Sequence, residues 1–196
     1  AVIAAGDVKK AINVLHEEFF ETTYKQVNLF IIGAGNVGKR LLSQFLSQQN
    51  YLQEHLGLQV RIAGIANSKK MIFNDEGIDL KNWKELLNAG QPMQLDAFIN
   101  IIKEKNLRNS VLADVTANDE VARVYDRLLQ KSISVVACNK VAASAEYNYY
   151  KKLKDLAREF NCRFLFETNV GAGLPIIGTL NDLLRSGDVV NKMQAV

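Results

Sequence analysis

The chain has 196 residues, of which 48% are hydrophobic, and this length predicts one domain with a short extension. The 24 Lys and Arg and 21 Asp and Glu leave a net charge of +3, spread along the chain, so nucleic acid is not expected as a partner. Apolar runs of about nine residues are far shorter than the roughly 20 that span a bilayer, which excludes a membrane-spanning protein. Two cysteines without metal-ligand spacing are typical of a reducing compartment, and we expect a soluble, cytoplasmic protein.

Residues 1–25 are predicted to form a unit separate from the main domain. Apolar residues recur there at helical spacing and predict a helix with one apolar face, made of Val8, Ile12, Leu15 and Phe19. Residues 22–25 carry no periodic pattern and are interpreted as a linker, so the main domain is expected over residues 26–196. The chain begins without an initiator Met or a leader pattern, and we expect it to be a piece of a longer protein.

From residue 26 onward, short runs rich in Val and Ile alternate with helical patterns, as βαβ units around a parallel sheet do. Strands are predicted at residues 27–32, 58–66, 110–115, 133–137 and 163–166, and residues 189–196 are a candidate for another. Helices are predicted at residues 36–49, around 80–87, around 95–102, and at 119–130, 145–160 and 175–187. The fold class is therefore α/β, a Rossmann-like doubly wound parallel sheet of at least five strands.

A GAGNVG motif directly follows the first predicted strand and opens the first helix, the context in which this pattern predicts a dinucleotide site. Gly33 permits the tight turn, Gly35 lets a pyrophosphate approach the backbone, and Gly38 allows the helix to pack closely on the strand. The N–H groups at the start of the helix, at Asn36 and Val37, would face the phosphates. A tight turn without a ligand is the weaker alternative.

The end of the second strand indicates which dinucleotide would bind. An Asp or Glu about 20 residues after the glycines usually holds the ribose hydroxyls of NAD, and no carboxylate stands there. Asn67, Ser68 and Lys69, followed by Lys70, could instead hydrogen-bond and neutralise a 2′-phosphate. This favours NADP(H) over NAD(H), although paired lysines are also common on solvated loops without any ligand.

Polar residues also follow the next two predicted strands, at the edge where open α/β sheets bind their ligands. Thr116, beside Ala117, could hydrogen-bond a nicotinamide ribose, and Lys140 could meet a carboxamide, ribose or substrate oxygen. The alternatives are that Thr116 caps a helix and that Lys140 is an ordinary surface lysine.

Residues 167–175 combine one carboxylate with two glycines that let carbonyl groups turn inward, a donor set that suits a hard cation. From the pattern alone, a tight turn with a capping polar residue is the stronger interpretation. His16 and His55 have no ligand-spaced neighbours and are interpreted as surface residues, and Cys138 as a small buried residue.

Five segments in this order and spacing carry a family resemblance: VNLFIIGAGNVGKRLLSQF, VRIAGIANSKK, VLADVTAN, VVACNKVAAS and ETNVGAGLPIIGTL. Over about residues 26–196 the chain resembles the homoserine dehydrogenase region of bifunctional aspartokinase/homoserine dehydrogenases. The resemblance implies reversible hydride transfer between NAD(P)H and L-aspartate 4-semialdehyde, which gives L-homoserine in the branch leading to threonine and methionine. It departs from the family at Cys138, where Pro is more usual.

The same resemblance implies roles for single residues. Residues 33–38 would hold the pyrophosphate, Thr116 and Ala117 the nicotinamide ribose, and Lys140 the nicotinamide end, where it could act as a catalytic residue by polarising the aldehyde oxygen. A structural sodium ion would be held by Glu167 and by the carbonyl groups of Val170, Ala172 and Leu174.

The resemblance also implies how the chain relates to a longer protein. Residues 1–23 would be the last strand and helix of a preceding ACT-type regulatory domain. The family continues into a catalytic and dimerisation region, so this piece is expected to bind cofactor but to turn over little small-molecule substrate alone, while the parent forms a homo-oligomer. The pattern leaves two alternatives. One is a Rossmann module that senses a dinucleotide without catalysis, and the other is an S-adenosylmethionine transferase, whose expected ribose-binding acid is missing near Asn67.

Overall fold

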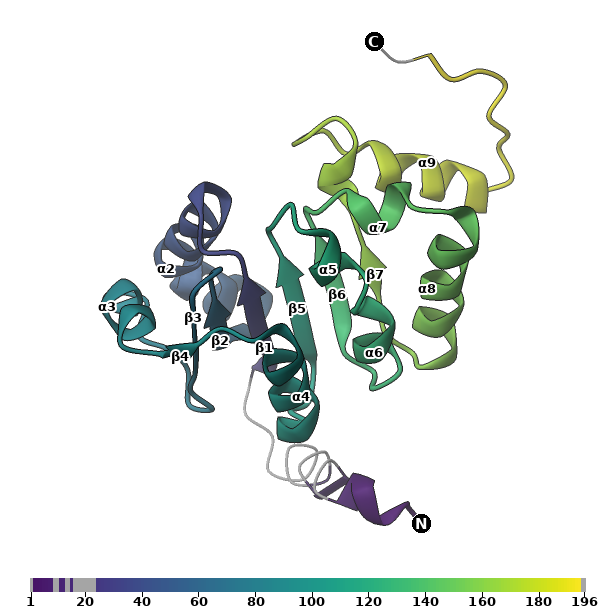
Figure 1. Ribbon diagram of the computed structural model, residues 1–196. Coiled ribbons are helices and arrows are strands. Elements are labelled where there is room, and N and C mark those ends of the chain that lie inside the picture. Colours follow the sequence, from purple (N-terminus) through teal and green to yellow (C-terminus); the bar gives the residue numbers. More distant parts are fainter. Residues whose placement is uncertain (1, 9–10, 13–14, 16–23, 195–196) are drawn as a thin grey trace.

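The structure, a computed structural model, describes residues 2–8, 11–12, 15 and 24–194 (Figure 1). A seven-stranded sheet with the order β4-β3-β2-β1-β5-β6-β7 forms its centre. The strands are β1 Lys25–Ile32, β2 Leu58–Ala66, β3 Lys70–Phe73, β4 Gln91–Pro92, β5 Ser110–Asp114, β6 Ser134–Ala137 and β7 Phe164–Leu165. β2, β1, β5, β6 and β7 are parallel, and β3 and β4 extend the sheet antiparallel beyond β2.

Helices connect the strands and cover both faces of the sheet. They are α2 Asn36–Leu56, α3 Trp83–Asn88, α4 Leu95–Lys105, α5 Asp119–Ala122, α6 Tyr125–Leu129, α7 Val141–Ser144, α8 Tyr147–Glu159 and α9 Ile176–Arg185. Two short 3-10 helices, η1 Ala5–Asp7 and η2 Glu167–Asn169, complete the described elements.

The apolar residues of β1 explain the layers, because neighbours along a strand point to opposite faces of the sheet. Ile31 faces a core shared with α2 and α3, and Phe30 faces a second core shared with α4, α6 and α8; both side chains are fully buried. Helices thus lie on both sides of a mainly parallel sheet (Figure 1), and the expected doubly wound α/β fold is confirmed.

Several boundaries differ from those predicted by the sequence. The antiparallel strands β3 and β4 were not predicted, and β4 forms at Gln91–Pro92, just before the expected helix. α2 runs on to Leu56 and ends at Gly57, whose φ of 59° is the left-handed conformation that commonly ends helices. Residues 189–194 form no strand.

The helix expected at residues 119–130 is interrupted between α5 and α6. The N–H of Val124 donates to the carbonyl of Val121, three residues back, which tightens the chain at the break. Val121, Tyr125 and Leu128 nevertheless all face the core, so the apolar spacing that predicted one helix continues across the interruption.

The N-terminal unit is only partly described. Residues 8, 11–12 and 15 are helical, as expected, whereas Phe19 lies outside the described residues. β1 begins at Lys25, so the last residue of the expected linker belongs to the sheet. The origin of residues 1–25 in a preceding regulatory domain stays a prediction. In the parts of the chain that the structure describes, no helix is long and apolar enough to cross a membrane.

Candidate functional site

The glycines of the GAGNVG motif occupy three different environments at the carboxyl end of β1. Gly33 has a φ of +106°, and a Cβ there would lie 2.9 Å from both Thr116 Cγ2 and the Val115 backbone. A Cβ on Gly38 would lie only 1.9 Å from the Gly33 carbonyl oxygen, whereas nothing lies within 4 Å of a Cβ on Gly35. The turn therefore packs tightly at two glycines and leaves open space at the third, as a backbone that receives a pyrophosphate requires.

Gly35 is also the N-cap of α2, where no side chain caps the helix. The N–H groups of the first helical turn have no partners within the helix and carry the positive end of its dipole. An open hollow of about 720 Å³ adjoins this turn and is lined by Asn36, Val37, Lys39, Arg40 and Ser43. Lys39 and Arg40 were not among the predicted site residues, although two cations directly after Gly38 are a signal visible in the sequence.

In the turn between β2 and β3, neighbouring polar side chains make different contacts. Asn67 shapes the turn, because its Oδ1 accepts hydrogen bonds from the N–H groups of Lys69 and Lys70, each at 2.7 Å. The Lys70 ammonium donates to the Gly90 carbonyl at 2.9 Å, so it is held by the short segment between α3 and β4. Ser68 and Lys69 remain exposed, so these two side chains are the ones left for a phosphate.

Asp114, at the end of β5, is fully buried and holds three groups in place. Its Oδ1 accepts the N–H of Thr116 at 2.8 Å, while its Oδ2 accepts the Tyr125 hydroxyl at 2.5 Å and Asn139 Nδ2 at 3.0 Å. Burial, and then the charge and hydrogen bond of Asp114, raise the pKa of the Tyr125 phenol far above its usual range. Tyr125 therefore stays a hydrogen-bond donor to this carboxylate at any ordinary pH.

Asn139 joins the loop after β5 to the loop after β6. Its Nδ2 donates to the Asn118 carbonyl at 2.9 Å and lies 3.4 Å from Thr116 Oγ1. Lys140 follows as the exposed N-cap of α7, so its side chain emerges at the same edge of the sheet as Thr116. Ala117 is also exposed there.

Glu167 caps α9 with both carboxylate oxygens. Oε1 accepts the N–H of Ile177 at 2.8 Å, and Oε2 accepts the N–H of Gly178 at 2.7 Å. The capping interpretation of this carboxylate is therefore confirmed. Among the expected cation ligands in the loop, the Leu174 carbonyl accepts the Ile176 N–H at 2.9 Å, and Ala172 has a left-handed φ of 51°. Whether these oxygens also hold sodium stays a prediction.

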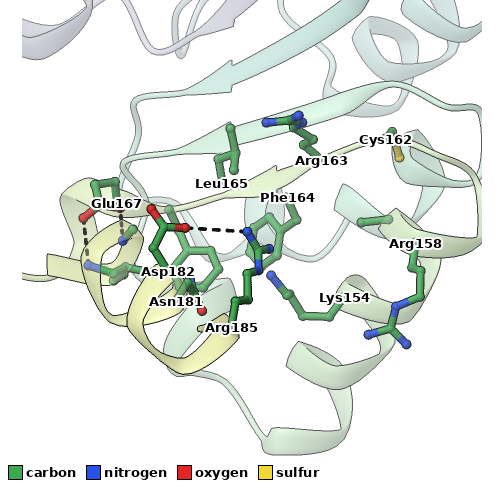
Figure 2. A pocket seen from close by; sticks show the side chains of 14 residues that line it. Lys154, Arg158, Cys162, Arg163, Phe164, Leu165, Glu167, Asn181, Asp182 and Arg185 are labelled. Atoms are coloured by element: carbon green, nitrogen blue, oxygen red, sulfur yellow. Dashed lines mark hydrogen bonds and ion pairs between the residues drawn. The ribbon is translucent and has the colours of Figure 1, made fainter. Parts of the chain in front are cut away.

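A second hollow, of about 610 Å³, lies between α8, β7 and α9 and was not predicted from the sequence. Figure 2 shows Lys154 and Arg185 extending toward one another inside it, while Glu167 turns to the backbone of α9. Partial burial, and then repulsion by Arg185 and Arg158, lower the pKa of Lys154. The lining therefore combines four cationic side chains with two carboxylates, Glu167 and Asp182, and Asp182 lies 3.8 Å from the Arg185 guanidinium.

The sequence-predicted residues converge because parallel strands bring their carboxyl ends to one edge. The Gly33 N–H donates to the Ala66 carbonyl, which places the glycine turn beside the β2–β3 turn. Gly33 also contacts Thr116, and Asn139 links that loop to Lys140. At the next strand, Asn169 Nδ2 donates to the Asn139 carbonyl at 3.2 Å, which attaches the Glu167 segment. Lys70 is turned away by its hydrogen bond to the Gly90 carbonyl.

Comparisons with known proteins agree with this geometry. The family model described as homoserine dehydrogenase, NAD binding domain, matches residues 33–167. A bifunctional aspartokinase/homoserine dehydrogenase of Buchnera aphidicola is 38% identical over 188 residues, which make up 95% of this chain and 23% of that protein. A chloroplastic bifunctional aspartokinase/homoserine dehydrogenase 2 of Arabidopsis thaliana is also 38% identical, over 100% of this chain and 21% of that protein.

Solved structures give the same result. A hyperthermophilic archaeal homoserine dehydrogenase in complex with NADPH superposes with a TM-score of 0.64 at 30% identity, over 80% of this chain and 48% of that one. The chain thus spans less than a quarter of the two curated relatives. Because the matched family model covers the glycine turn and every strand end of the site, the chain belongs to the family of homoserine dehydrogenase NAD-binding domains, whose cofactor is a nicotinamide dinucleotide.

Proposed function

We propose that this chain is the cofactor-binding part of an NADP(H)-dependent homoserine dehydrogenase, which interconverts L-homoserine and L-aspartate 4-semialdehyde. The observation that carries the proposal is the contact of the Gly33 turn with Thr116, with Asn139 and Lys140 at the same edge. A turn suited to a phosphate, a hydroxyl suited to a ribose and a cation lie at one edge of the sheet, which supports binding of a dinucleotide and a small substrate there.

The glycine turn would hold the pyrophosphate. Gly35 offers open space and the first turn of α2 offers N–H groups without partners inside the helix, while Lys39 and Arg40 add positive charge beside them. A nicotinamide dinucleotide bound there supplies the hydride for reduction of the aldehyde. Everything else that the chain contributes is binding, orientation and charge.

The preference for NADP(H) over NAD(H) is proposed from the β2–β3 turn. Ser68 and Lys69 stay exposed after the internal contacts of Asn67 and Lys70 have been made. A hydroxyl and an ammonium without a neighbouring carboxylate suit a 2′-phosphate better than two ribose hydroxyls. NADH would lack this interaction and would bind more weakly.

Lys140 is proposed as the catalytic residue. A positive ammonium near the carbonyl oxygen of the aldehyde stabilises the negative charge that develops on that oxygen as hydride arrives. Thr116 would place the nicotinamide ribose through its hydroxyl, which already accepts the Asn118 N–H at 3.2 Å and retains its own proton to donate.

A structural sodium ion at Glu167 is proposed as well. Each Glu167 oxygen accepts one backbone N–H and keeps further lone pairs, and carbonyl oxygens such as those of Val170, Ala172 and Leu174 are ligands that hard cations take. The donor set therefore fits sodium in chemistry. Its test is whether NaCl stabilises the protein more than choline chloride at equal ionic strength, and whether Glu167→Gln abolishes the difference.

The whole protein around this chain is also part of the proposal. We propose a cytoplasmic homo-oligomeric enzyme of threonine and methionine biosynthesis, in which regions outside this chain complete the substrate site. The chain alone would then bind cofactor and turn over little or nothing. A turnover number for the isolated chain close to that of the full enzyme would show that no region outside this chain is needed for the substrate site.

The direct test is a thermal-unfolding titration of this chain with NADPH, NADH and S-adenosylmethionine. A ligand present at about 100 times its Kd adds roughly 2.7 kcal/mol to the free energy of unfolding. We expect NADPH to stabilise the chain more than NADH does, and S-adenosylmethionine to have no effect. If neither NADPH nor NADH stabilises the chain, the proposed dinucleotide site is wrong.

A further inference from the structure

Asn139 is the most connected polar residue at the site, and the proposed function leaves it without a role. It is 2% exposed. Its side chain donates to Asp114 and to the Asn118 carbonyl, and its own carbonyl accepts a hydrogen bond from Asn169. One residue thus ties the loops that follow three neighbouring strands, β5, β6 and β7.

The hydrogen-bond partners of the Asn139 amide fix its orientation. Asp114 is a carboxylate that only accepts, so the amide nitrogen of Asn139 must face it, and the amide oxygen must face the other way. That oxygen accepts the N–H of Val141 at 3.1 Å. The Tyr125 hydroxyl donates to the same oxygen of Asp114, which keeps the carboxylate in place for Asn139.

These contacts hold Lys140 from both sides along the chain. Asn139 precedes it with a fixed side chain, and Val141 follows it with its N–H held by that same side chain. The Lys140 carbonyl accepts both the N–H of Ser144 at 3.0 Å and its hydroxyl at 2.9 Å. The backbone of Lys140 is therefore held by hydrogen bonds on each side, while its side chain remains exposed and reaches out from that point.

We propose that Asn139, oriented by Asp114, is a positioning residue that sets where the Lys140 ammonium lies relative to the ribose held by Thr116. This inference rests on the proposed function, because it assigns Asn139 an effect only through Lys140. The distance between a polarising cation and the reacting oxygen matters steeply, since a displacement of about 1 Å can cost roughly 10²-fold in rate.

A double-mutant cycle in the full enzyme tests the inference, with Asn139→Ala, Lys140→Ala and both together. We expect Lys140→Ala to lower kcat by about 10²–10⁴-fold and Asn139→Ala by about 10²-fold, with a smaller change in KM for homoserine. In the Lys140→Ala background, Asn139→Ala should change kcat by less than about twofold, because a group that acts through Lys140 has nothing left to position.

Asn28→Ala is the matched control for loss of stability. Asn28 is another buried asparagine, 3% exposed, and its Nδ2 donates to the Arg108 carbonyl at 2.7 Å. It lies in the amino-terminal half of β1, away from the carboxyl edge of the sheet, so kcat should stay near that of the wild type. If Asn139→Ala does not fold, Asn139→Ser supplies a smaller polar group and completes the same cycle.

Two results would overturn the inference while leaving the proposed function standing: an unchanged kcat for Asn139→Ala, or an equal fold loss with and without Lys140. A wild-type enzyme that does not oxidise homoserine with NADP⁺, or a Lys140→Ala variant at full rate, would instead remove the proposed function and the inference with it. Failure of the inference would appear in the Asn139→Ala variants, and failure of the proposed function in the wild type or in Lys140→Ala, so the two can be distinguished.

Discussion

A Cβ at position 38 would lie 1.9 Å from the Gly33 carbonyl oxygen, so Gly33 and Gly38 lie in backbone contact across the β1–α2 turn. No side chain can occupy that space, because the neighbouring atom belongs to the main chain and cannot rotate away. The packing of α2 on the sheet and the shape of the glycine turn therefore depend on the same contact. Gly35, two residues after Gly33, lacks any such neighbour.

Gly38→Ala and Gly35→Ala should consequently fail in different ways. We expect Gly38→Ala to destabilise the fold by about 3 kcal/mol or more, because α2 must move away from the turn. Gly35→Ala should change stability by less than about 1 kcal/mol, since its Cβ meets no protein atom, yet weaken NADPH binding by filling the space for the pyrophosphate. Urea unfolding and NADPH titration of both variants separate the effects. Normal NADPH affinity in Gly35→Ala would contradict the proposed phosphate position.

Tyr125→Phe removes one of the donors to the buried Asp114 carboxylate. We expect a loss of about 1–3 kcal/mol in the free energy of unfolding near neutral pH. Because burial raises the pKa of Tyr125 in the folded state, its contribution is complete below the unfolded pKa of about 10 and is lost as pH rises above that value. The difference between wild type and Tyr125→Phe, measured by urea unfolding, should therefore be smaller at pH 11 than at pH 8. A difference that grows with pH would contradict this assignment.

Lys69→Gln and Lys70→Gln form a matched pair for the cofactor preference. Both remove one positive charge, but only Lys70 has its ammonium on the Gly90 carbonyl. We expect Lys69→Gln to weaken NADPH binding by about tenfold and NADH binding by less than about threefold, because a charge-assisted hydrogen bond to the 2′-phosphate is lost. Lys70→Gln should change neither affinity by more than about threefold, since a surface charge away from the phosphate is screened by salt. Equal effects of the two variants would show that only net charge matters.

Glu167→Ala should loosen the start of α9. Its carboxylate accepts the N–H groups of Ile177 and Gly178, and loss of such a cap costs about 0.5–2 kcal/mol. Amide hydrogen exchange in α9 should accelerate by up to about tenfold, which corresponds to roughly 1.4 kcal/mol. Glu146→Ala is the control, because Glu146 stands at the N-cap of α8 without a side-chain capping bond. Unchanged exchange in α9 would contradict the capping role.

The sequence predicted the α/β class and the positions of the five parallel strands because both depend on local sequence patterns. Buried parallel strands need runs of Val and Ile, as in β1 and β2, and the turn after β1 needs glycines at fixed offsets. The helix across residues 119–130 shows the limit of such patterns. Apolar spacing continued through α5 and α6, and it carried no information about the tightened backbone at Val124.

Within the site, the sequence by itself determined which residues stand at the carboxyl edge of the sheet: a strand order with parallel pairing brings Gly33, Thr116, Lys140 and Glu167 there whatever their side chains do. Only the tertiary structure decided what those side chains contact. The Asp114–Asn139 hydrogen bond joins residues 25 apart in sequence, and the Lys70–Gly90 bond joins residues 20 apart. Such partners are set by the packing of separate loops, which no local periodicity encodes. The proposed positioning role of Asn139 and the contact that turns Lys70 away could therefore be found only from the tertiary structure.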